Sequence, residues 1–356
     1  MSSSIRIRTL TDGGQQPLEI ARAVADFLGA ANQSLDLAQY DFNLGPETRE
    51  VVGGAIREAA GRVIPVRILY NVDHANPIPV PPPPEPDVEL ISALGVPARA
   101  IAGVPDLMHH KFVVRDGETV WTGSTNWTDD SWSRQENLIV TVDSRDLAHA
   151  FTLAFDELWE TGSVEQSGRV EPRPVEVDDV RVKPWFTPGN GEALSHRIAK
   201  KIAQAKRVRI CSPVITAAPV LATLAQVLTD GKADVAGCVD ATQVEEVVRQ
   251  WHANGNVAWK LPLLDRIMQG PFSGKPSEPW EATGSLHNFM HAKVVVADDI
   301  VFTGSFNLSH SGEKNAENVL EIRDAGLAAE LSEYVDEVRR RYPALTPTRS
   351  STAASR

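Results

Sequence analysis

Two segments of the chain place a histidine and a lysine two residues apart in an apolar, strand-like run. The first contains His109 and Lys111, and the second contains His291 and Lys293. Each run leads into an acidic turn and then into a Gly-Ser-x-Asn sequence. Side chains two residues apart share one face of a strand, and the turn folds each segment into a hairpin. We therefore expect His, Lys, Ser and Asn to gather at one end of a hairpin, twice.

Such a cluster suits the chemistry of a phosphoryl group. Lysine and the asparagine amide donate hydrogen bonds to anionic oxygens, while small Gly and Ser residues let a ligand approach the backbone. Histidine can act as a nucleophile or base, and its protonated form as an acid. In-line displacement at phosphorus needs a nucleophile on one side and a proton donor on the other. Two facing copies of the motif supply one histidine for each role. Lysine charge opposes a metal ion, and no Cys or carboxylate cluster accompanies the histidines, so neither a metal nor a cofactor is expected.

The two copies together resemble the signature of the phospholipase D superfamily, His-x-Lys-x4-Asp followed by Gly-Ser-x-Asn. The matching residues are His109, Lys111, Asp116, Gly123, Ser124 and Asn126 in the first copy, and His291, Lys293, Asp298, Gly304, Ser305 and Asn307 in the second. A single His-x-Lys sequence would be weak evidence for the family. Two full copies make the resemblance strong, and it extends over nearly the whole chain.

The resemblance implies a mechanism in which one motif histidine attacks a phosphodiester to form a phosphohistidine. By analogy, we expect His109 to be the nucleophile and His291 the acid and base, with the reverse assignment left open. The groups that would hold the nonbridging oxygens are Lys111, Lys293, Asn126 and Asn307.

Further residues match supporting positions of the family. Glu136 and Glu317, in the repeated Glu-Asn pairs, match a downstream glutamate that orients a histidine together with a motif serine, Ser124 or Ser305. A carboxylate on the distal imidazole nitrogen fixes the tautomer and stabilises the charged ring. The motif residues Asp116 and Asp298 fall at the turns, where a structural role is expected.

The duplication also predicts the fold. In each half, amphipathic helical stretches alternate with buried strands, which indicates two duplicated α/β domains with mixed β-sheets flanked by helices, related by a pseudo-two-fold axis as in phospholipase D-like proteins. We expect a first domain over 1–162, a polar linker over 163–182, a second domain over 183–345 and a disordered tail over 346–356. Both half-sites lie in one chain, so a monomer would suffice for a complete site.

Two insertions and several aromatic residues lie outside the repeat. A proline-rich stretch over 76–87 reads as a semi-rigid spacer, and a long irregular segment over 268–289 precedes the second histidine and could shape access to it. His287 could reach the site from this segment. Trp127 and Trp132 could either stack on a substrate or pack in the core.

Composition bounds the remaining questions. The 356 residues carry a formal net charge of -12, which argues against a general polyanion-coating protein without excluding a narrow phosphate-binding cleft. Cys211 and Cys238 read as small core residues in a reducing compartment. The start of the sequence lacks an apolar signal region and no stretch is long enough to span a bilayer, so a cytoplasmic protein is expected.

The motif predicts the reaction without specifying the leaving group. A phospholipid substrate, with peripheral membrane contact, would need an apolar rim, for which Phe272, Trp280 and Phe289 are candidates. A nucleic-acid substrate, cut by a metal-independent endonuclease, would need a basic cleft with stacking aromatics. A non-catalytic phosphate-binding scaffold is the third alternative.

Overall fold

The computed structural model describes residues 4–73, 86–278 and 287–345. The first half contains β1 (Ile5–Leu10), α1 (Pro17–Gly29), β2 (Leu35–Gln39), β3 (Phe42–Asn43), α2 (Pro46–Gly61), β4 (Val66–Val72), α3 (Val88–Ala93), β5 (Ala98–Ala102), β6 (Lys111–Arg115), β7 (Thr119–Gly123), β8 (Trp127–Thr128), α4 (Asp129–Ser133), β9 (Gln135–Asp143) and α5 (Arg145–Thr161). The second half contains β10 (Val175–Val177), β11 (Val180–Phe186), α6 (Gly191–Gln204), β12 (Arg207–Cys211), α7 (Ala218–Asp230), β13 (Asp234–Asp240), α8 (Ala241–Ala253), a short 3-10 turn (Ala258–Lys260), α9 (Leu261–Met268), β14 (Phe272–Lys275), β15 (Phe289–Met290), β16 (Val294–Ala297), β17 (Ile300–Gly304), α10 (His310–Lys314), β18 (Asn318–Arg323) and α11 (Ala325–Arg341).

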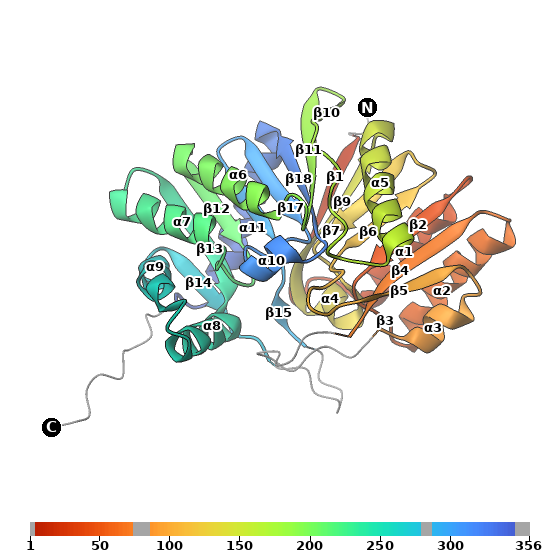
Figure 1. Ribbon diagram of the computed structural model, residues 1–356, viewed down its shortest axis with the longest axis horizontal. Helices are drawn as coiled ribbons and strands as arrows, with labels where there is room; N and C mark the ends of the chain where they lie inside the picture. Colours follow the sequence, from red (N-terminus) through yellow and green to blue (C-terminus); the bar gives the residue numbers. More distant parts are fainter. Residues whose placement is uncertain (1–3, 74–85, 279–286, 346–356) are drawn as a thin grey trace.

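The two halves build two mixed sheets of matching topology. The first sheet has the order β1-β9-β7-β6-β2-β4-β5, and the second has β10-β11-β18-β17-β16-β12-β13-β14. Apart from β10, each strand of the second sheet has a counterpart at the same place in the first. In both sheets the hairpin strands pair antiparallel, and the last three strands of each order, β2-β4-β5 and β12-β13-β14, run parallel. The predicted duplicated α/β fold with mixed sheets and flanking helices is therefore confirmed, and Figure 1 shows the two halves side by side.

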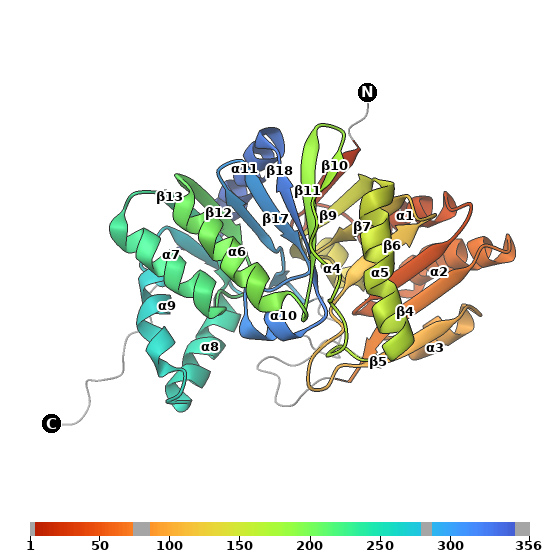
Figure 2. The same cartoon turned by 45° about the horizontal axis from the view of Figure 1, so that its top comes forward.

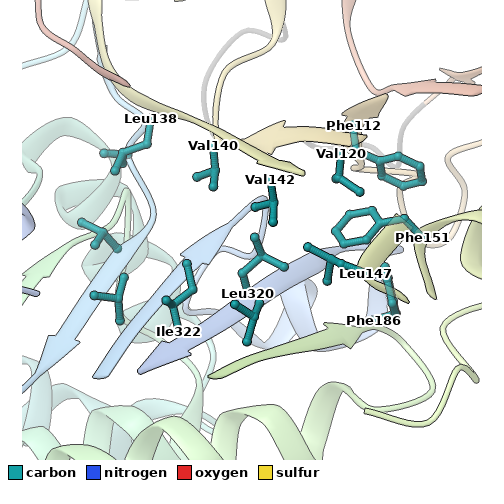
Figure 3. Close-up of a cluster of buried hydrophobic side chains, with 14 of the residues drawn as sticks. Phe112, Val120, Leu138, Val140, Val142, Leu147, Phe151, Phe186, Leu320 and Ile322 are labelled. Carbon is teal, nitrogen blue, oxygen red and sulfur yellow. The ribbon is translucent and has the colours of Figure 1, made fainter. Parts of the chain in front are cut away.

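Three clusters of buried hydrophobic side chains lie between the layers of the fold. One cluster joins the first sheet to α1, α2 and α3, and another joins the second sheet to α6, α7, α8 and α9. The central cluster contains side chains from both sheets and from α5 and α11. Figure 3 shows Val140 and Val142 of β9 on one side of this cluster and Leu320 and Ile322 of β18 on the other. Because this core is shared, the two halves are held in one fixed relationship at the ends of their strands.

The acidic turns form the expected hairpins. In the first copy Arg115 pairs with Thr119, and in the second Ala297 pairs with Ile300, so the first turn is one residue longer. This difference accounts for the extra residue between the histidine and the Gly-Ser sequence of the first copy.

The segments expected to be irregular are more ordered than predicted. Strand β10 and the start of β11 lie inside the predicted linker 163–182, because valines alternate there and the second sheet gains an edge strand. Strand β14 lies inside the predicted irregular segment 268–289 and pairs with β13. Most of the proline-rich stretch, residues 279–286 with Trp280, and the predicted tail lie outside the described residues. Within the described residues, no helix is both long enough and apolar enough to cross a bilayer.

Candidate active site

The two histidine–lysine motifs lie together between the halves. Lys111 begins β6 and Lys293 directly precedes β16, and each histidine stands two residues earlier. His109, Lys111, His291 and Lys293 are exposed by only 2–6 % of their surface. The charge of Lys293 lowers the pKa of His109, and the charge of Lys111 lowers the pKa of His291. The lysine of each half is therefore close enough to affect the histidine of the other half, as expected if the two copies of the motif face each other.

A buried carboxylate from the second half holds the first histidine. The Nδ1 of His109 lies 2.8 Å and 2.9 Å from the two carboxylate oxygens of Glu317. The amide of Asn315 donates to Glu317 at 3.3 Å. Burial raises the pKa of Glu317 to about 7, against the opposing charges of Lys111 and Lys293. With Nδ1 engaged, the Nε2 of His109 is the ring nitrogen left to meet a substrate.

The second histidine has a different partner from the one expected. The Nδ1 of His291 lies 3.1 Å from the Oδ1 of Asn137, a neutral amide oxygen. The carboxylate of Glu136, which the family resemblance led us to expect beside a histidine, instead accepts hydrogen bonds from Lys275, Tyr342 and the backbone of Asp12 in the described part of the chain. The two histidines are thus held by a carboxylate in one case and by an amide in the other.

A one-residue shift of strand register explains this difference. Gly123 pairs with Ile139 in the first sheet, whereas Gly304 pairs with Val319 in the second. Aligned on these glycines, Asn137 occupies the place of Glu317, and Glu136 lies one residue too early to reach His291. Sequence comparison aligns the two Glu-Asn pairs and therefore misses Asn137. The sequence contains no gap that marks this shift, because the spacing from the Gly-Ser sequence to the Glu-Asn pair is the same in both copies.

Glu136 belongs instead to a buried charged cluster beside the site. Its carboxylate accepts a hydrogen bond from Lys275 of β14 at 2.6 Å and another from the hydroxyl of Tyr342. Lys275 also lies 3.1 Å from the carboxylate of Asp12. Glu136 is fully buried and the side chain of Lys275 is 1 % exposed. This cluster joins the first half to the second, and nothing in the sequence pointed to Lys275.

The motif lysines are held in matching ways. Each Nζ donates to the backbone oxygen of its own histidine at 2.8 Å, Lys111 to His109 and Lys293 to His291. Lys111 also lies over the ring of Tyr40, 4.7 Å from its centroid, and the same ring packs edge-on against His109 at 4.6 Å. Burial lowers the pKa of Lys111 to about 7 and that of Lys293 well below its usual value. Burial makes positive charge costly at these two lysines, and an anion placed beside them would offset that cost.

The surroundings of both motif histidines favour the neutral imidazole. Burial first, and then the charges of the two motif lysines, lower the pKa of His109 and of His291 well below 6.5. A bound anion would oppose the lysine charges and favour the protonated form of a nearby histidine. The site can therefore acquire a proton on entry of a phosphodiester.

The two motif asparagines carry unsatisfied acceptors. Among the described residues, no group hydrogen-bonds to the Oδ1 of Asn126 or to that of Asn307, although both atoms are buried. Buried polar atoms are nearly always paired in folded proteins, so an orphan at the same place in each copy points to a missing partner. Because the oxygen and nitrogen of an amide are interchangeable by rotation, either atom can face an incoming ligand.

The Gly-Ser residues support the strands. The hydroxyl of Ser124 donates to Asn137 at 2.8 Å, and that of Ser305 accepts from the backbone of Asn318 at 3.0 Å. A side chain at Gly123 or Gly304 would stand 2.1 Å from a carbonyl oxygen of the neighbouring strand. We expected these glycines to let a ligand approach, but the structure shows that close strand packing requires them.

The motif aspartates lie at the turns. Asp116 and Asp298 adopt left-handed backbone conformations with φ of 58° and 53°. The carboxylate of Asp116 accepts from the backbone of Asn32, Gln33 and Ser34 at 2.6–3.0 Å. Asp298 accepts in the same way from Arg207 at 2.9 Å. Both residues fasten a hairpin turn to the chain before the next strand, away from the reacting groups.

The aromatic candidates divide between the core and the site. Trp127 and Trp132 are almost fully buried, so they are core residues, and Phe272 is likewise 1 % exposed and cannot form an apolar rim. Phe289 is half-buried, with its ring 5.4 Å from that of His291. The ring of His287 follows at 5.3 Å from Phe289, so this histidine does lie near the site.

Other residues behave as packing groups. His110 is buried against Phe112 and Phe186. Burial lowers its pKa to about 4, so it stays neutral in the core. Cys211 and Cys238 are free, buried thiols on neighbouring strands, as expected.

Comparison with known proteins identifies the family that both halves match. The family described as "Cardiolipin synthase, PLD-like domain" matches residues 24–159 and again residues 198–339, one match in each half. Phosphatidylserine synthase from Haemophilus influenzae Rd KW20 has a similar fold, with a TM-score of 0.68 at 15% identity over 95% of this chain and 87% of that one.

Two curated relatives show similarity over part of the chain. The mitochondrial cardiolipin hydrolase of Chlamydomonas reinhardtii is 28% identical over 145 residues, which are 40% of this chain and 59% of that protein. The human mitochondrial cardiolipin hydrolase is 29% identical over 132 residues, 37% of this chain and 47% of its own length. The chain thus spans about half the length of these relatives.

Proposed function

Because the chain belongs to the phospholipase D-like family described as cardiolipin synthase, PLD-like domain, we propose that it is a phosphodiesterase that works through a phosphohistidine. The observation that carries this proposal is the buried group of two histidines and two lysines contributed by both halves. Such a group offers a nucleophile, a proton donor and two cations to one phosphorus atom.

His109 is the better nucleophile of the two. When its Nε2 forms a bond to phosphorus, the ring becomes positively charged, and the carboxylate of Glu317 at 2.8 Å stabilises that charge. His291 has only a neutral amide oxygen at its Nδ1, so its protonated form gives up a proton more readily. The unequal partners therefore support the assignment that the family resemblance suggested.

The reaction then has two balanced steps. The Nε2 lone pair of His109 attacks phosphorus, the bond from phosphorus to the leaving oxygen breaks, and protonated His291 gives that oxygen its proton. Water or an acceptor alcohol next attacks phosphorus, His291 takes the proton of the attacking hydroxyl, and the bond to His109 breaks. Lys111 and Lys293, with the amides of Asn126 and Asn307, would hold the nonbridging oxygens in both steps.

We further propose a phospholipid as the substrate. The curated relatives are named cardiolipin hydrolases, and the family description names cardiolipin synthase. The net charge of -12 also disfavours a long polyanionic substrate. Phe289, half-buried beside His291, is a described aromatic residue placed to meet an acyl chain or glycerol backbone.

Trapping the covalent intermediate tests the proposal. Protein in EDTA is mixed with cardiolipin-containing vesicles or, separately, with single-stranded DNA, then quenched in base and digested for mass spectrometry. We expect a phosphorus adduct on His109 with the vesicles and none in His109→Ala. His149→Ala, an exposed histidine on α5, is the matched control.

The outcomes are distinct. An adduct formed only with DNA would establish the endonuclease alternative. An adduct on His291 in place of His109 would reverse the two roles. Absence of any adduct and of any cleavage with either substrate would favour a phosphate-binding scaffold and contradict the proposal.

A further inference from the structure

A second collection of cations lies on the outer face of the second sheet, apart from the active site. Five basic side chains line a pocket of about 340 Å³, together with one carboxylate and two apolar residues. This basic pocket is formed by Arg181, Lys183, Arg197, Lys201 and Arg323 with Glu321, Ile300 and Pro174. Its charge runs against that of the whole chain, which has 47 acidic and 35 basic residues.

Two neighbouring strands, β11 and β18, and the helix α6 direct these side chains to one place. Side chains alternate along a strand, and Ile322 of β18 points into the central core in Figure 3, so Glu321 and Arg323 point to the opposite face. Arg181 and Lys183 of β11 stand on that same outer face, directly opposite Arg323 and Glu321. Helix α6 covers this end of the sheet, as Figure 2 shows, and adds Arg197 and Lys201, one turn apart.

The arrangement places like charges together on the strands and on the helix. Arg181 and Arg323 are cross-strand partners, and like charges directly opposite each other destabilise a sheet. Arg197 and Lys201 are four residues apart on a helix, which is likewise unfavourable. Burial and then Arg197 lower the pKa of Lys201, and Arg323 lowers it further. Like charges therefore repel one another in the basic pocket both on the sheet and on the helix that covers it.

The one carboxylate of the pocket does not neutralise it. Glu321 accepts from Arg197 at 3.0 Å and from the indole of Trp185 at 3.1 Å. Within the described residues, no carboxylate lies at ion-pair distance from Arg181, Lys183 or Lys201. Arg323 reaches Asp299 at 3.3 Å near the rim. In the described part of the chain, three of the five cations thus have no carboxylate at ion-pair distance, although the ammonium of Lys183 lies over the ring of Trp185.

We propose that the basic pocket binds a phosphate-bearing anion of at least two negative charges, as a site separate from the active site. An anion between the strands and α6 would be shared by cations of both and would remove their mutual repulsion. The pocket volume suits a small charged group. Arg323 stands six residues along an extended strand from Glu317, about 20 Å away, so one phosphate group cannot occupy both sites.

Calorimetric titration with inorganic pyrophosphate tests the proposal. Wild type is compared with Arg181→Gln/Lys201→Gln and with Lys200→Gln, a neighbouring exposed lysine of α6 that does not line the pocket. The active site is unchanged in all three proteins, so pyrophosphate that binds there contributes equally to each titration and cancels in the comparison. We expect the double variant to bind pyrophosphate more weakly by roughly tenfold or more, with Lys200→Gln unchanged.

Thermal unfolding and vesicle binding complete the test. Without anion, the double variant should melt no lower than wild type, because its like-charge contacts are removed, and pyrophosphate should raise its melting temperature less. Sedimentation with phosphatidic acid vesicles, against phosphatidylcholine vesicles, separates the sources: binding of wild type but not of the double variant identifies a lipid headgroup, and binding of pyrophosphate alone identifies a soluble anion. Equal pyrophosphate affinity in wild type and the double variant, or no binding by wild type, would overturn the proposal.

Discussion

The Nζ of Lys275 lies 2.6 Å from the carboxylate of Glu136, in a contact that joins the two halves beneath the active site. Glu136 is the residue that the repeated motif matches to Glu317, yet it binds this lysine while Asn137 contacts His291. The pseudo-symmetry of the fold is therefore broken at the reacting groups. In one half-site the histidine contacts a carboxylate, and in the other it contacts an amide oxygen.

We expect this buried ion pair to matter for stability. Lys275→Met leaves the carboxylate of Glu136 buried without a cation, and loss of one partner of such a pair costs about 3–5 kcal/mol. Lys275→Met/Glu136→Gln removes both charges and should recover a large part of that loss. Urea unfolding of wild type, both single variants and the double variant gives the coupling energy. Additive effects of the two substitutions would show that the pair contributes nothing as a pair.

The unequal partners predict unequal effects on catalysis. Glu317→Gln replaces the anion on His109 and should lower kcat by about 10²–10⁴-fold, as expected when the tautomer and charge of a catalytic histidine are no longer fixed. Glu136→Gln, the matched change at the other motif position, should lower kcat less than tenfold, because its carboxylate does not contact His291. Steady-state assays with bis-(p-nitrophenyl) phosphate, well below the melting temperature of each variant, measure both. Equal losses would contradict the distinction between the half-sites.

A plot of kcat/KM against pH should be a narrow bell centred close to neutrality. The pKa of Glu317 is raised to about 7, so this carboxylate loses its charge as the pH falls below that value and His109 loses its anionic partner. The pKa of Lys111 is lowered to about 7, so this cation loses its charge as the pH rises, and affinity for an anionic substrate falls. The profile of kcat/KM reports these groups in the free enzyme.

Lys111→Arg provides the control for the alkaline side. A guanidinium stays charged at every pH of the assay, so the alkaline limb should move upward even if the maximal rate falls with the changed geometry. Far-UV circular dichroism over the same range verifies that the protein stays folded. A wild-type profile that stays level from pH 7 to 9 would show that Lys111 is not required in its charged form.

The turn aspartates should affect stability more than activity. Asp116→Ala removes the acceptor for three backbone N–H groups and places alanine at a positive φ, so unfolding should become easier by about 1–3 kcal/mol. Asp116→Asn keeps an acceptor oxygen and tolerates the left-handed conformation, so its effect should be smaller. Denaturant unfolding measures both, and kcat is expected to stay within about threefold of wild type. A large loss of kcat with unchanged stability would assign Asp116 to the chemistry instead.

Activity should not depend on a metal ion. The motif lysines would repel a cation at the position of the phosphorus atom, and the proposed steps need none. Dialysis against EDTA, followed by assay with and without added Mg²⁺, Mn²⁺, Zn²⁺ or Ca²⁺, checks this expectation. Loss of activity in EDTA that one of these ions restores would contradict it.

The sequence by itself determined the repeat, the alternation of helices and strands, and the residues of both motifs. These patterns are local: His109 lies two residues before the start of β6 at Lys111, and the turn at Asp116 folds the hairpin, through geometry that spans only a few residues. For the same reason apolar periodicity predicts helices over residues 146–160 and 325–341, which match α5 and α11.

Only the tertiary structure decided which groups meet across the two halves. The partner of His109 is 208 residues away in the chain, and whether His291 meets Glu136 or Asn137 depends on a one-residue shift in strand pairing. Lys275 reaches Glu136, and the five cations of the basic pocket converge, because sheets and helices pack at particular angles and registers. Packing energies summed over the whole shared core select those registers, and no short segment of sequence contains them.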